Sequence, residues 1–220
     1  MSQQGQWQVA GSAAEVYEKE LVPAVFGPWA PLVIDLAHPQ KGDRVIDVAC
    51  GTGIVARMVA NRVGPTGVVV GVDLNPGMLT VARAAWPTDS HSSAPVQWHE
   101  ASADKLPFPN ASFNVAYCQL GLQFFADRAA ALREMHRVLA TGGRLALMVW
   151  RGIDESPGFA ELAAAWSDMS VKRRRISCAR HLGCPMPTSW PLSFATPVFK
   201  TLSFNRGLAR FAFRRSKGLC

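Results

Sequence analysis

The sequence predicts an α/β fold in which a doubly wound, mostly parallel sheet carries helices on both faces. Short runs rich in Val, Ile and Leu alternate with helical stretches of about ten residues, which is typical of βαβ crossovers. Glycines follow the first of these runs directly and an aspartate ends the second, and both features are typical of ligand sites in such sheets. The 220 residues, 49% hydrophobic and 18% charged, suffice for an ample core and exclude a generally disordered chain.

Each expected element has a local reason in the sequence. Strands are expected where β-branched runs are short and bounded by turn residues, at 44–49, 67–73, 95–100, 113–118 and 144–150. Helices are expected at 12–21, 28–38, 54–61, 75–85, 128–139 and 157–168. Asn75 and Asp127 are expected N-caps, and Thr141–Gly143 is expected to end a helix. The expected apolar face of the second helix consists of Trp29, Leu32, Val33 and Leu36.

The glycine loop after the first expected strand is a candidate ligand site. It reads Asp-Val-Ala-Cys-Gly-Thr-Gly over residues 47–53, and ligands of doubly wound sheets bind at this edge. Asp73, twenty residues beyond Gly53, is placed to accept both hydroxyls of a ribose. The G-x-G-x-x-A spacing of residues 51–56 also allows a nicotinamide or flavin dinucleotide. Asp47 favours another ligand, because a carboxylate repels a pyrophosphate and attracts cationic groups such as those of S-adenosylmethionine.

Four segments resemble successive motifs of the class I S-adenosylmethionine-dependent methyltransferases. They are Val45–Gly53, Val72–Met78, Ala101–Phe108 and Leu132–Gly143. The most similar subgroup comprises small-molecule enzymes related to ubiquinone/menaquinone C-methyltransferases, and the resemblance covers about residues 12–168. It implies the Rossmann-like fold of that class, S-adenosylmethionine as the cofactor, and methyl transfer to a small-molecule acceptor by in-line displacement.

The resemblance also implies which residues bind the cofactor: Asp47, Ala49, Gly51, Gly53, Asp73, Leu74, Met78, Ser102, Ala103 and Gln119. The first four would line the methionine moiety, and the carboxylate of the second strand would hold the ribose. The next two would flank the adenine, the pair at 102–103 would meet its edge, and the last would lie beside the reacting methyl group. Ser102 departs from the Asp that is frequent at its position in the family, which puts that hydrogen bond in doubt.

No residue is assigned a catalytic role, since methyl transfer depends mainly on alignment and exclusion of water. No Cys/His spacing predicts a metal site. His99, inside an expected strand, is interpreted as a strand-face residue. Tyr17, Phe26 and Trp29 form an aromatic cluster with two open interpretations. It is either a hydrophobic cap on the sheet or, as in the family, a lid over the cofactor.

The net charge of +7 divides unevenly, because residues 171–220 carry eleven basic side chains and no acidic one. The expected organisation is an N-terminal helical lid (1–40), a cofactor-binding core (41–168) and this basic segment (169–220). Three explanations of the segment stay open: nucleic-acid binding by a nucleic-acid methyltransferase, a divergent solvated end, or a shifted reading frame in the encoding DNA. An altered segment would also allow a protein that binds S-adenosylmethionine with little or no turnover. A hairpin over residues 197–213 is conceivable.

The sequence also bears on location and partners. Five cysteines without paired spacing indicate a reducing, cytoplasmic environment, and no apolar run approaches the roughly 20 residues of a membrane span. We therefore expect a cytoplasmic enzyme with a small-molecule acceptor and no membrane span. The oligomeric state does not follow from the sequence.

Overall fold

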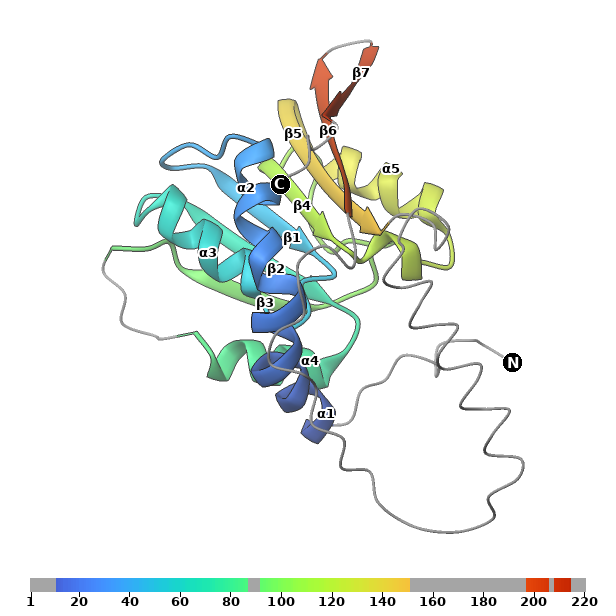
Figure 1. Ribbon diagram of the computed structural model, residues 1–220. Coiled ribbons are helices and arrows are strands. Elements are labelled where there is room, and N and C mark those ends of the chain that lie inside the picture. Colours follow the sequence, from blue (N-terminus) through green and yellow to red (C-terminus); the bar gives the residue numbers. More distant parts are fainter. Residues whose placement is uncertain (1–10, 87–91, 151–196, 206–207, 215–220) are drawn as a thin grey trace, which may run out of the picture. The chain divides into compact units, whose positions relative to one another are not determined.

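The computed structural model describes residues 11–86, 92–150, 197–205 and 208–214 (Figure 1). The chain divides into two compact units, one made of residues 1–149 and 199–220 and the other of residues 150–198. Nearly all described elements belong to the first unit. The helix expected at 157–168 lies outside the described residues. The boundaries proposed for the lid, the core and the basic segment stay predictions.

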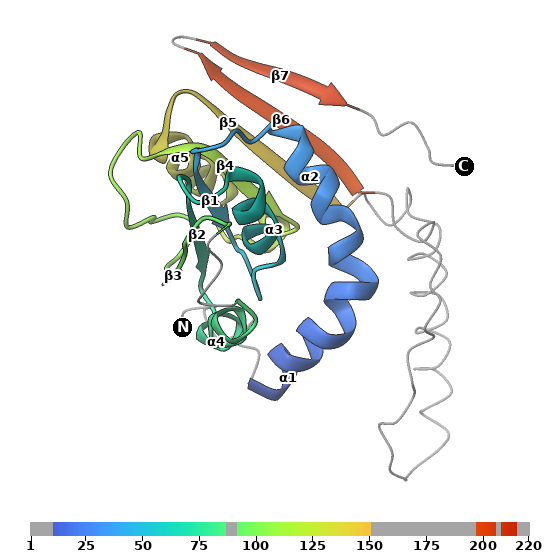
Figure 2. The ribbon, with the colours of Figure 1, turned by 90° about the vertical axis from the view of Figure 1, so that its left-hand side faces the viewer.

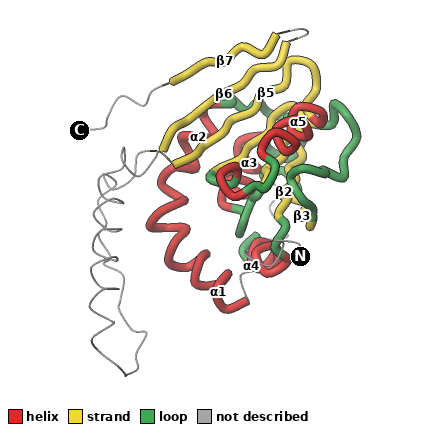
Figure 3. Tube along the Cα trace, turned by 90° about the vertical axis from the view of Figure 1, so that its right-hand side faces the viewer, coloured by secondary structure: helices red, strands yellow, loops and turns green. Residues whose placement is uncertain are grey.

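The first unit is built on a sheet whose strand order is β3-β2-β1-β4-β5-β6-β7. Its described strands are β1 (Arg44–Val48), β2 (Val68–Asp73), β3 (Val96–Glu100), β4 (Phe113–Gln119), β5 (Leu139–Trp150), β6 (Pro197–Asn205) and β7 (Leu208–Arg214). The pairs among β1 to β5 are parallel, whereas β6 and β7 pair antiparallel beside β5 (Figure 3). The hairpin that the sequence left open is therefore present. The strand order reverses direction between β1 and β4, which confirms the doubly wound fold class.

Helices pack on both faces of the sheet (Figure 1). The described helical elements are α1 (Gly11–Val16), η2 (Tyr17–Phe26), η3 (Gly27–Trp29), α2 (Ala30–Leu36), α3 (Ile54–Val63), α4 (Pro76–Ala84), η4 (Leu122–Phe124) and α5 (Arg128–Val138). On one face, Tyr117 Oη donates to the Ile34 carbonyl in α2, and Asp47 accepts from the Ala56 amide in α3. On the opposite face, Met135 of α5 packs in a buried cluster with alternate residues of β1, β2 and β4.

The two helices expected near the N-terminus form one continuous run of helical turns, from α1 through η2 and η3 to α2 (Figure 2). Pro23 lies inside η2, a stretch of π-helix, where the wider turn accommodates a residue without an amide hydrogen. Of the expected apolar face of the second helix, Val33 is confirmed as buried, Trp29 and Leu36 are half-buried, and Leu32 is wrong. The buried residues are Ala30, Val33 and Ile34, whereas Leu32 is 40% exposed. The packed face thus combines a small residue, Ala30, with the large side chains of Val33 and Ile34.

The expected helix caps are confirmed. Asn75 Oδ1 accepts hydrogen bonds from the amides of Gly77 (2.8 Å) and Met78 (3.4 Å), and Asp127 Oδ1 accepts one from Ala130 (2.8 Å). The expected stop at Thr141–Gly143 is wrong, because α5 ends at Val138 and β5 already begins at Leu139. Leu139 pairs with Phe113, and the next pair is Val115 with Arg144. The glycine pair forms an irregularity inside the strand, with Gly142 at φ +79°.

Trp98 of β3 lies across two glycines on the α3 face of the sheet. Gly71, its direct register partner in β2, has no room for a side chain. A Cβ on Gly71 would lie 2.5 Å from the Trp98 ring and 3.1 Å from Cys50 Sγ, and a Cβ on Gly53 would also overlap the ring. The indole thus packs one side of the glycine loop from a strand two positions away from β1.

The substitution Gly71→Ala should therefore destabilise the protein by about 1–3 kcal/mol, the usual cost of overpacking a filled core. For a domain of this size the melting temperature should fall by about 2–12 °C. The double variant Gly71→Ala/Trp98→Leu, which removes the overlapping ring atoms, should lose less stability than the sum of the two single variants. Strictly additive losses in thermal melts would show that Trp98 does not set the space at Gly71.

Candidate cofactor-binding site

The predicted site residues lie at or beyond the ends of strands along one edge of the sheet. Asp47 is the residue before the last of β1, and Ala49, Gly51 and Gly53 follow that strand. Asp73 ends β2, and Gln119 ends β4. Ser102 and Ala103 follow β3, while the predicted adenine neighbours lie just after β2 and in α4. The structure thus brings residues from the ends of four adjacent strands to the edge where the strand order reverses. Their contacts with a ligand stay predictions.

Asp73 connects three loops at this edge. Its Oδ2 accepts a 2.8 Å hydrogen bond from the Gly51 amide, and its Oδ1 accepts a 2.9 Å bond from the Asn75 amide. Its backbone carbonyl accepts a 3.1 Å bond from Ala101, at the start of the loop after β3. Each carboxylate oxygen keeps a further lone pair for a ligand hydroxyl. One side chain therefore fixes the glycine loop and remains able to accept from a ribose.

The turns after β1 and β4 hold left-handed backbone at two non-glycine residues. Ala49 has φ +58° and Leu120 has φ +59°, and both directly follow strands that flank the switch point. Gly121 is required there, since a Cβ would lie 2.5 Å from Ala49 Cβ and 3.0 Å from Cys118 Sγ. Such strained positions gather at functional sites. Leu120 was missed in the sequence, which contains no signal for a left-handed leucine.

Two carboxyl groups, one buried and one half-buried, lie at this edge. Asp47 is 1% exposed, and its Oδ2 accepts a 3.1 Å hydrogen bond from the Ala56 amide at the start of α3. Burial, with a smaller contribution from Asp73, raises the pKa of Asp47 to about 8 despite that hydrogen bond. Burial also raises the pKa of Asp73, against the opposing effect of its backbone hydrogen bonds. A cationic ligand at this edge would favour the ionised form of both carboxyl groups and lower their pKa values.

The π-helical segment η2 contacts the glycine loop. A Cβ on Gly51 would lie 3.6 Å from Tyr17 Oη, and the Tyr17 ring stacks on Phe26 with centroids 4.8 Å apart. Burial raises the pKa of Tyr17, and the charges of Asp73, Glu18 and Asp47 raise it further. The phenol therefore lies among the acidic groups of the site. Of the expected aromatic cluster, these two rings stack on each other, and Tyr17 is the one beside the loop.

Two polar contacts join η2 to other elements, one to helix α3 and one to strand β4. Arg57 Nη2 in α3 donates to Glu18 Oε1 at 2.6 Å, and both side chains are largely buried, with 13% and 24% of their surface exposed. Gln119 Nε2, at the end of β4, donates to the Phe26 carbonyl at 2.8 Å. These contacts join residues 39 and 93 positions apart. They place the helical segment over the ends of β1 and β4.

Several buried polar atoms near these elements have no hydrogen-bond partner in the described part of the chain. They include Glu18 Oε2, Thr52 Oγ1 and Gln119 Oε1. Buried polar atoms are nearly always satisfied, and two of these three can only accept. These unpartnered acceptors, together with the carboxyl groups of Asp47 and Asp73, fit the sulfonium and ammonium groups of S-adenosylmethionine. They do not fit the pyrophosphate of a dinucleotide.

Comparison with known proteins shows which family the central part of the chain matches. Residues 46–147 match a family model described as a methyltransferase domain. This region is a methyltransferase domain. The match lies within the expected range of 12–168 and contains most of the motifs that carry the resemblance, so the methyltransferase resemblance is confirmed. It also contains every predicted cofactor-binding residue.

The methyltransferase domain has many similar relatives. Over 142 residues the chain is 39% identical to the ubiquinone/menaquinone biosynthesis C-methyltransferase UbiE of Ectopseudomonas mendocina, covering 64% of this chain and 54% of that protein. The UbiE protein of Neisseria meningitidis is 42% identical over 120 residues, covering 54% of this chain and 48% of that protein. The chain thus spans about half the length of the curated relatives it matches.

Solved structures confirm the class I methyltransferase fold. The YcgJ protein of Bacillus subtilis superposes with a TM-score of 0.51 and 28% identity, covering 57% of this chain and 52% of that one. A SAM-dependent methyltransferase of Aquifex aeolicus shares the fold with a TM-score of 0.54 and 18% identity, covering 66% and 74% of the respective chains. None of the helices among the described residues is long and apolar enough to cross a bilayer.

Proposed function

We propose that this protein transfers a methyl group from S-adenosylmethionine to a small-molecule acceptor. The observation that carries the proposal is the hydrogen bond from the Gly51 amide to Asp73 at the point where the strand order reverses. The buried Asp47 lies on the neighbouring strand β1. This arrangement offers a ribose acceptor and an acidic surface for a cationic ligand within one methyltransferase domain.

In this proposal the cofactor supplies a methyl group on a sulfonium, which carries its own leaving group. The chain's residues then need to bind, orient and exclude water. Asp47, Ala49, Gly51 and Gly53 would line the methionine moiety, and Asp73 would hold the ribose. The contact of Tyr17 with the glycine loop supports the lid interpretation of the N-terminal helices over the cap interpretation.

The remaining predicted contacts complete the adenine side of the pocket. Leu74, a large apolar side chain that is 49% exposed beside Asp73, would gain an apolar partner by covering one face of the adenine. Met78 in α4 would cover the other face. Ser102 and Ala103 would meet the edge of the base. Gln119, whose Oε1 lacks a partner among the described residues, would lie beside the transferred methyl group.

The acceptor class is part of the proposal. Relatives named for C-methylation in ubiquinone and menaquinone biosynthesis support a small molecule rather than a nucleic acid. Cysteines used as free, buried side chains at Cys50 and Cys118 support a cytoplasmic location.

Calorimetric titration with S-adenosylhomocysteine and with NAD tests the cofactor. We expect the first to bind and the second to give no heat above dilution. The reverse result would indicate a dinucleotide enzyme and refute the proposal. Incubation with S-adenosylmethionine and a panel of demethylated quinone precursors tests turnover. Binding without any methylated product across such a panel would favour a protein that binds the cofactor with little or no turnover.

A further inference from the structure

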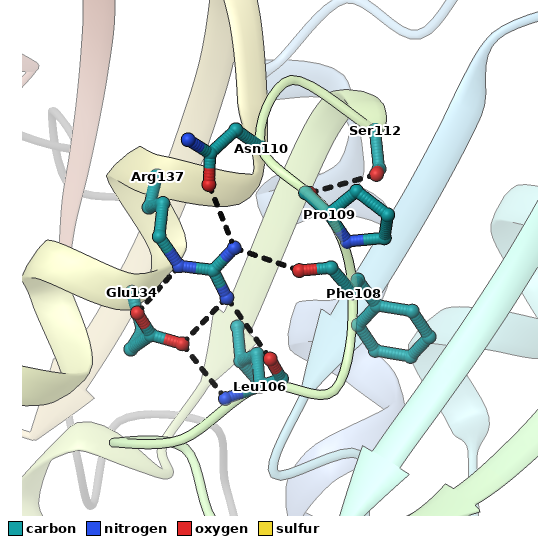
Figure 4. A network of polar contacts seen from close by, with 7 residues as sticks. All are labelled: Leu106, Phe108, Pro109, Asn110, Ser112, Glu134 and Arg137. Atoms are coloured by element: carbon teal, nitrogen blue, oxygen red, sulfur yellow. Dashed lines mark hydrogen bonds and ion pairs between the residues drawn. The ribbon is translucent and has the colours of Figure 1, made fainter.

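A polar network holds the loop after β3 against helix α5 (Figure 4). Arg137 lies at its centre. Its Nε and Nη2 donate to the two carboxylate oxygens of Glu134 at 2.6 and 2.7 Å. Its Nη2 also donates to the Leu106 carbonyl at 2.9 Å, and its Nη1 donates to the Phe108 carbonyl at 2.7 Å and to Asn110 Oδ1 at 3.0 Å. Glu134 Oε2 in turn accepts from the Leu106 amide at 2.9 Å.

The planar geometry of arginine makes this network specific. Its three nitrogens reach a carboxylate, two carbonyls and an amide oxygen at once, which the single ammonium of a lysine cannot do. The hydrogen bond from Arg137 is the main cause of a lowered pKa of Glu134, so the carboxylate stays ionised near neutral pH. The backbone adds another bond, from the Ala111 amide to the Arg137 carbonyl at 3.0 Å. Five hydrogen bonds from four residues thus hold the segment 106–111 against α5.

The tied segment continues directly into the predicted adenine contact. Three residues separate Leu106 from Ser102, and the Lys105 amide donates to the Ser102 carbonyl at 3.1 Å. At the other end, the Ala101 amide donates to the Asp73 carbonyl at 3.1 Å. Ala103 and Leu106 are buried in the same apolar cluster. Residues 101–106 therefore form a short bridge, held by Asp73 at one end and by Glu134 and Arg137 at the other.

We propose that Arg137, together with Glu134, is a positioning residue that sets the base selectivity of the cofactor site through the bridge 101–106. This inference rests on the proposed function. Recognition of a base edge depends on hydrogen bonds whose strength falls steeply with distance and angle. Contacts to the ribose and the methionine moiety come from other loops, so loosening the bridge should affect the base and spare the rest of the ligand.

The test compares two ligands that differ only at the base edge. S-adenosylhomocysteine has a 6-amino group, whereas S-inosylhomocysteine has a 6-oxo group and so reverses the donor and acceptor pattern. We expect the parent protein to prefer the adenosyl ligand by about tenfold or more, as sites built around hydrogen bonds do. In Arg137→Lys, adenosyl affinity should fall so that the preference is within about threefold, with inosyl affinity nearly unchanged.

Matched variants separate positioning from folding. Arg133→Lys, at an exposed position of the same helix, should keep the parent preference. Asn110→Ala removes one contact to Arg137 from an exposed loop position and should lower the preference by a smaller factor without changing the melting temperature. If Arg137→Lys does not fold, the inference is tested with Asn110→Ala alone.

The outcomes distinguish the two proposals. A parent protein that binds neither ligand refutes the proposed function, and this inference with it. A parent that binds both equally has no base selectivity, which overturns the inference alone. The same holds if Asn110→Ala and Arg137→Lys keep the full preference, or if both ligands weaken by one common factor.

Discussion

Replacement of Asp73 by alanine is expected to weaken S-adenosylhomocysteine binding by about 30-fold to several hundred-fold, because two charge-assisted hydrogen bonds to the ribose are lost. The substitution also leaves the Gly51 and Asn75 amides without their acceptor. The glycine loop and the start of α4 should therefore loosen, and the melting temperature should fall as well. Calorimetric titration and thermal melts measure the two effects separately.

Two comparisons make the Asp73 result specific. Asp35→Ala changes an exposed carboxylate on α2, which pairs with Arg62 at the end of α3, and should leave the affinity at the parent value. A 2′,3′-dideoxy form of S-adenosylhomocysteine lacks both ribose hydroxyls, so Asp73→Ala should hardly affect its binding. An affinity for the normal ligand within a factor of three of the parent would remove Asp73 from the site.

Replacement of Asp47 by asparagine is expected to change the pH dependence of stability. The pKa of Asp47 is raised from 3.8 to about 8 in the folded protein, so between these values the folded state holds a proton that the unfolded chain has released. The free energy of unfolding of the parent should therefore fall as pH rises from about 4 to 8. The asparagine side chain cannot ionise, so the variant should be more stable than the parent at pH 8 by about 3–5 kcal/mol, and nearly equal to it at pH 4.5.

Denaturant unfolding at intervals between pH 4.5 and 8.5 measures this difference. Asp104→Asn, at an exposed position, should follow the parent curve. If the free energy of unfolding changes with pH in the same way for the parent and for Asp47→Asn, then Asp47 is ionised in the folded protein over this whole pH range.

The carboxyl group of Asp47 should also affect the binding of S-adenosylmethionine. A cationic ligand lowers the pKa of a nearby carboxyl group, so S-adenosylmethionine should displace a proton from the Asp47 region near neutral pH. Titrations in two buffers with different heats of ionisation measure that release, and neutral S-adenosylhomocysteine should cause less of it. Asp47→Asn should weaken the cationic ligand more than the neutral one. The substitution Asp47→Asn is then expected to raise stability at pH 8 and to lower the affinity for the cofactor.

Much of the fold was predictable because it follows from local rules. Residue periodicity, capping side chains and glycine positions placed the first five strands, the caps at Asn75 and Asp127, and the order of strands and helices along the chain. The glycine loop and the position of Asp73 twenty residues later also lie in local sequence. Parallel strands then bring their carboxyl ends to one edge, so the general place of the site followed from the sequence as well.

Two predictions from local sequence were wrong, one about a helix face and one about a helix end. In α2 the apolar residues do not fall on one side, so their positions did not show that Ile34 is buried and Leu32 is exposed. The glycines at 142–143 suggested a helix end, but pairing of Leu139 with Phe113 extends β5 through them. In both places a tertiary contact outweighed the local preference.

By itself, then, the sequence determined the doubly wound fold, the edge that brings the predicted site residues together and the family that residues 46–147 match. Only the tertiary structure decided that Glu18 pairs with Arg57, that Trp98 fills the space over Gly71, and that Arg137 holds the loop after β3. Each of these contacts joins segments far apart in the chain or on different strands. Their formation depends on how the elements pack, and no periodicity or spacing in the sequence records that packing.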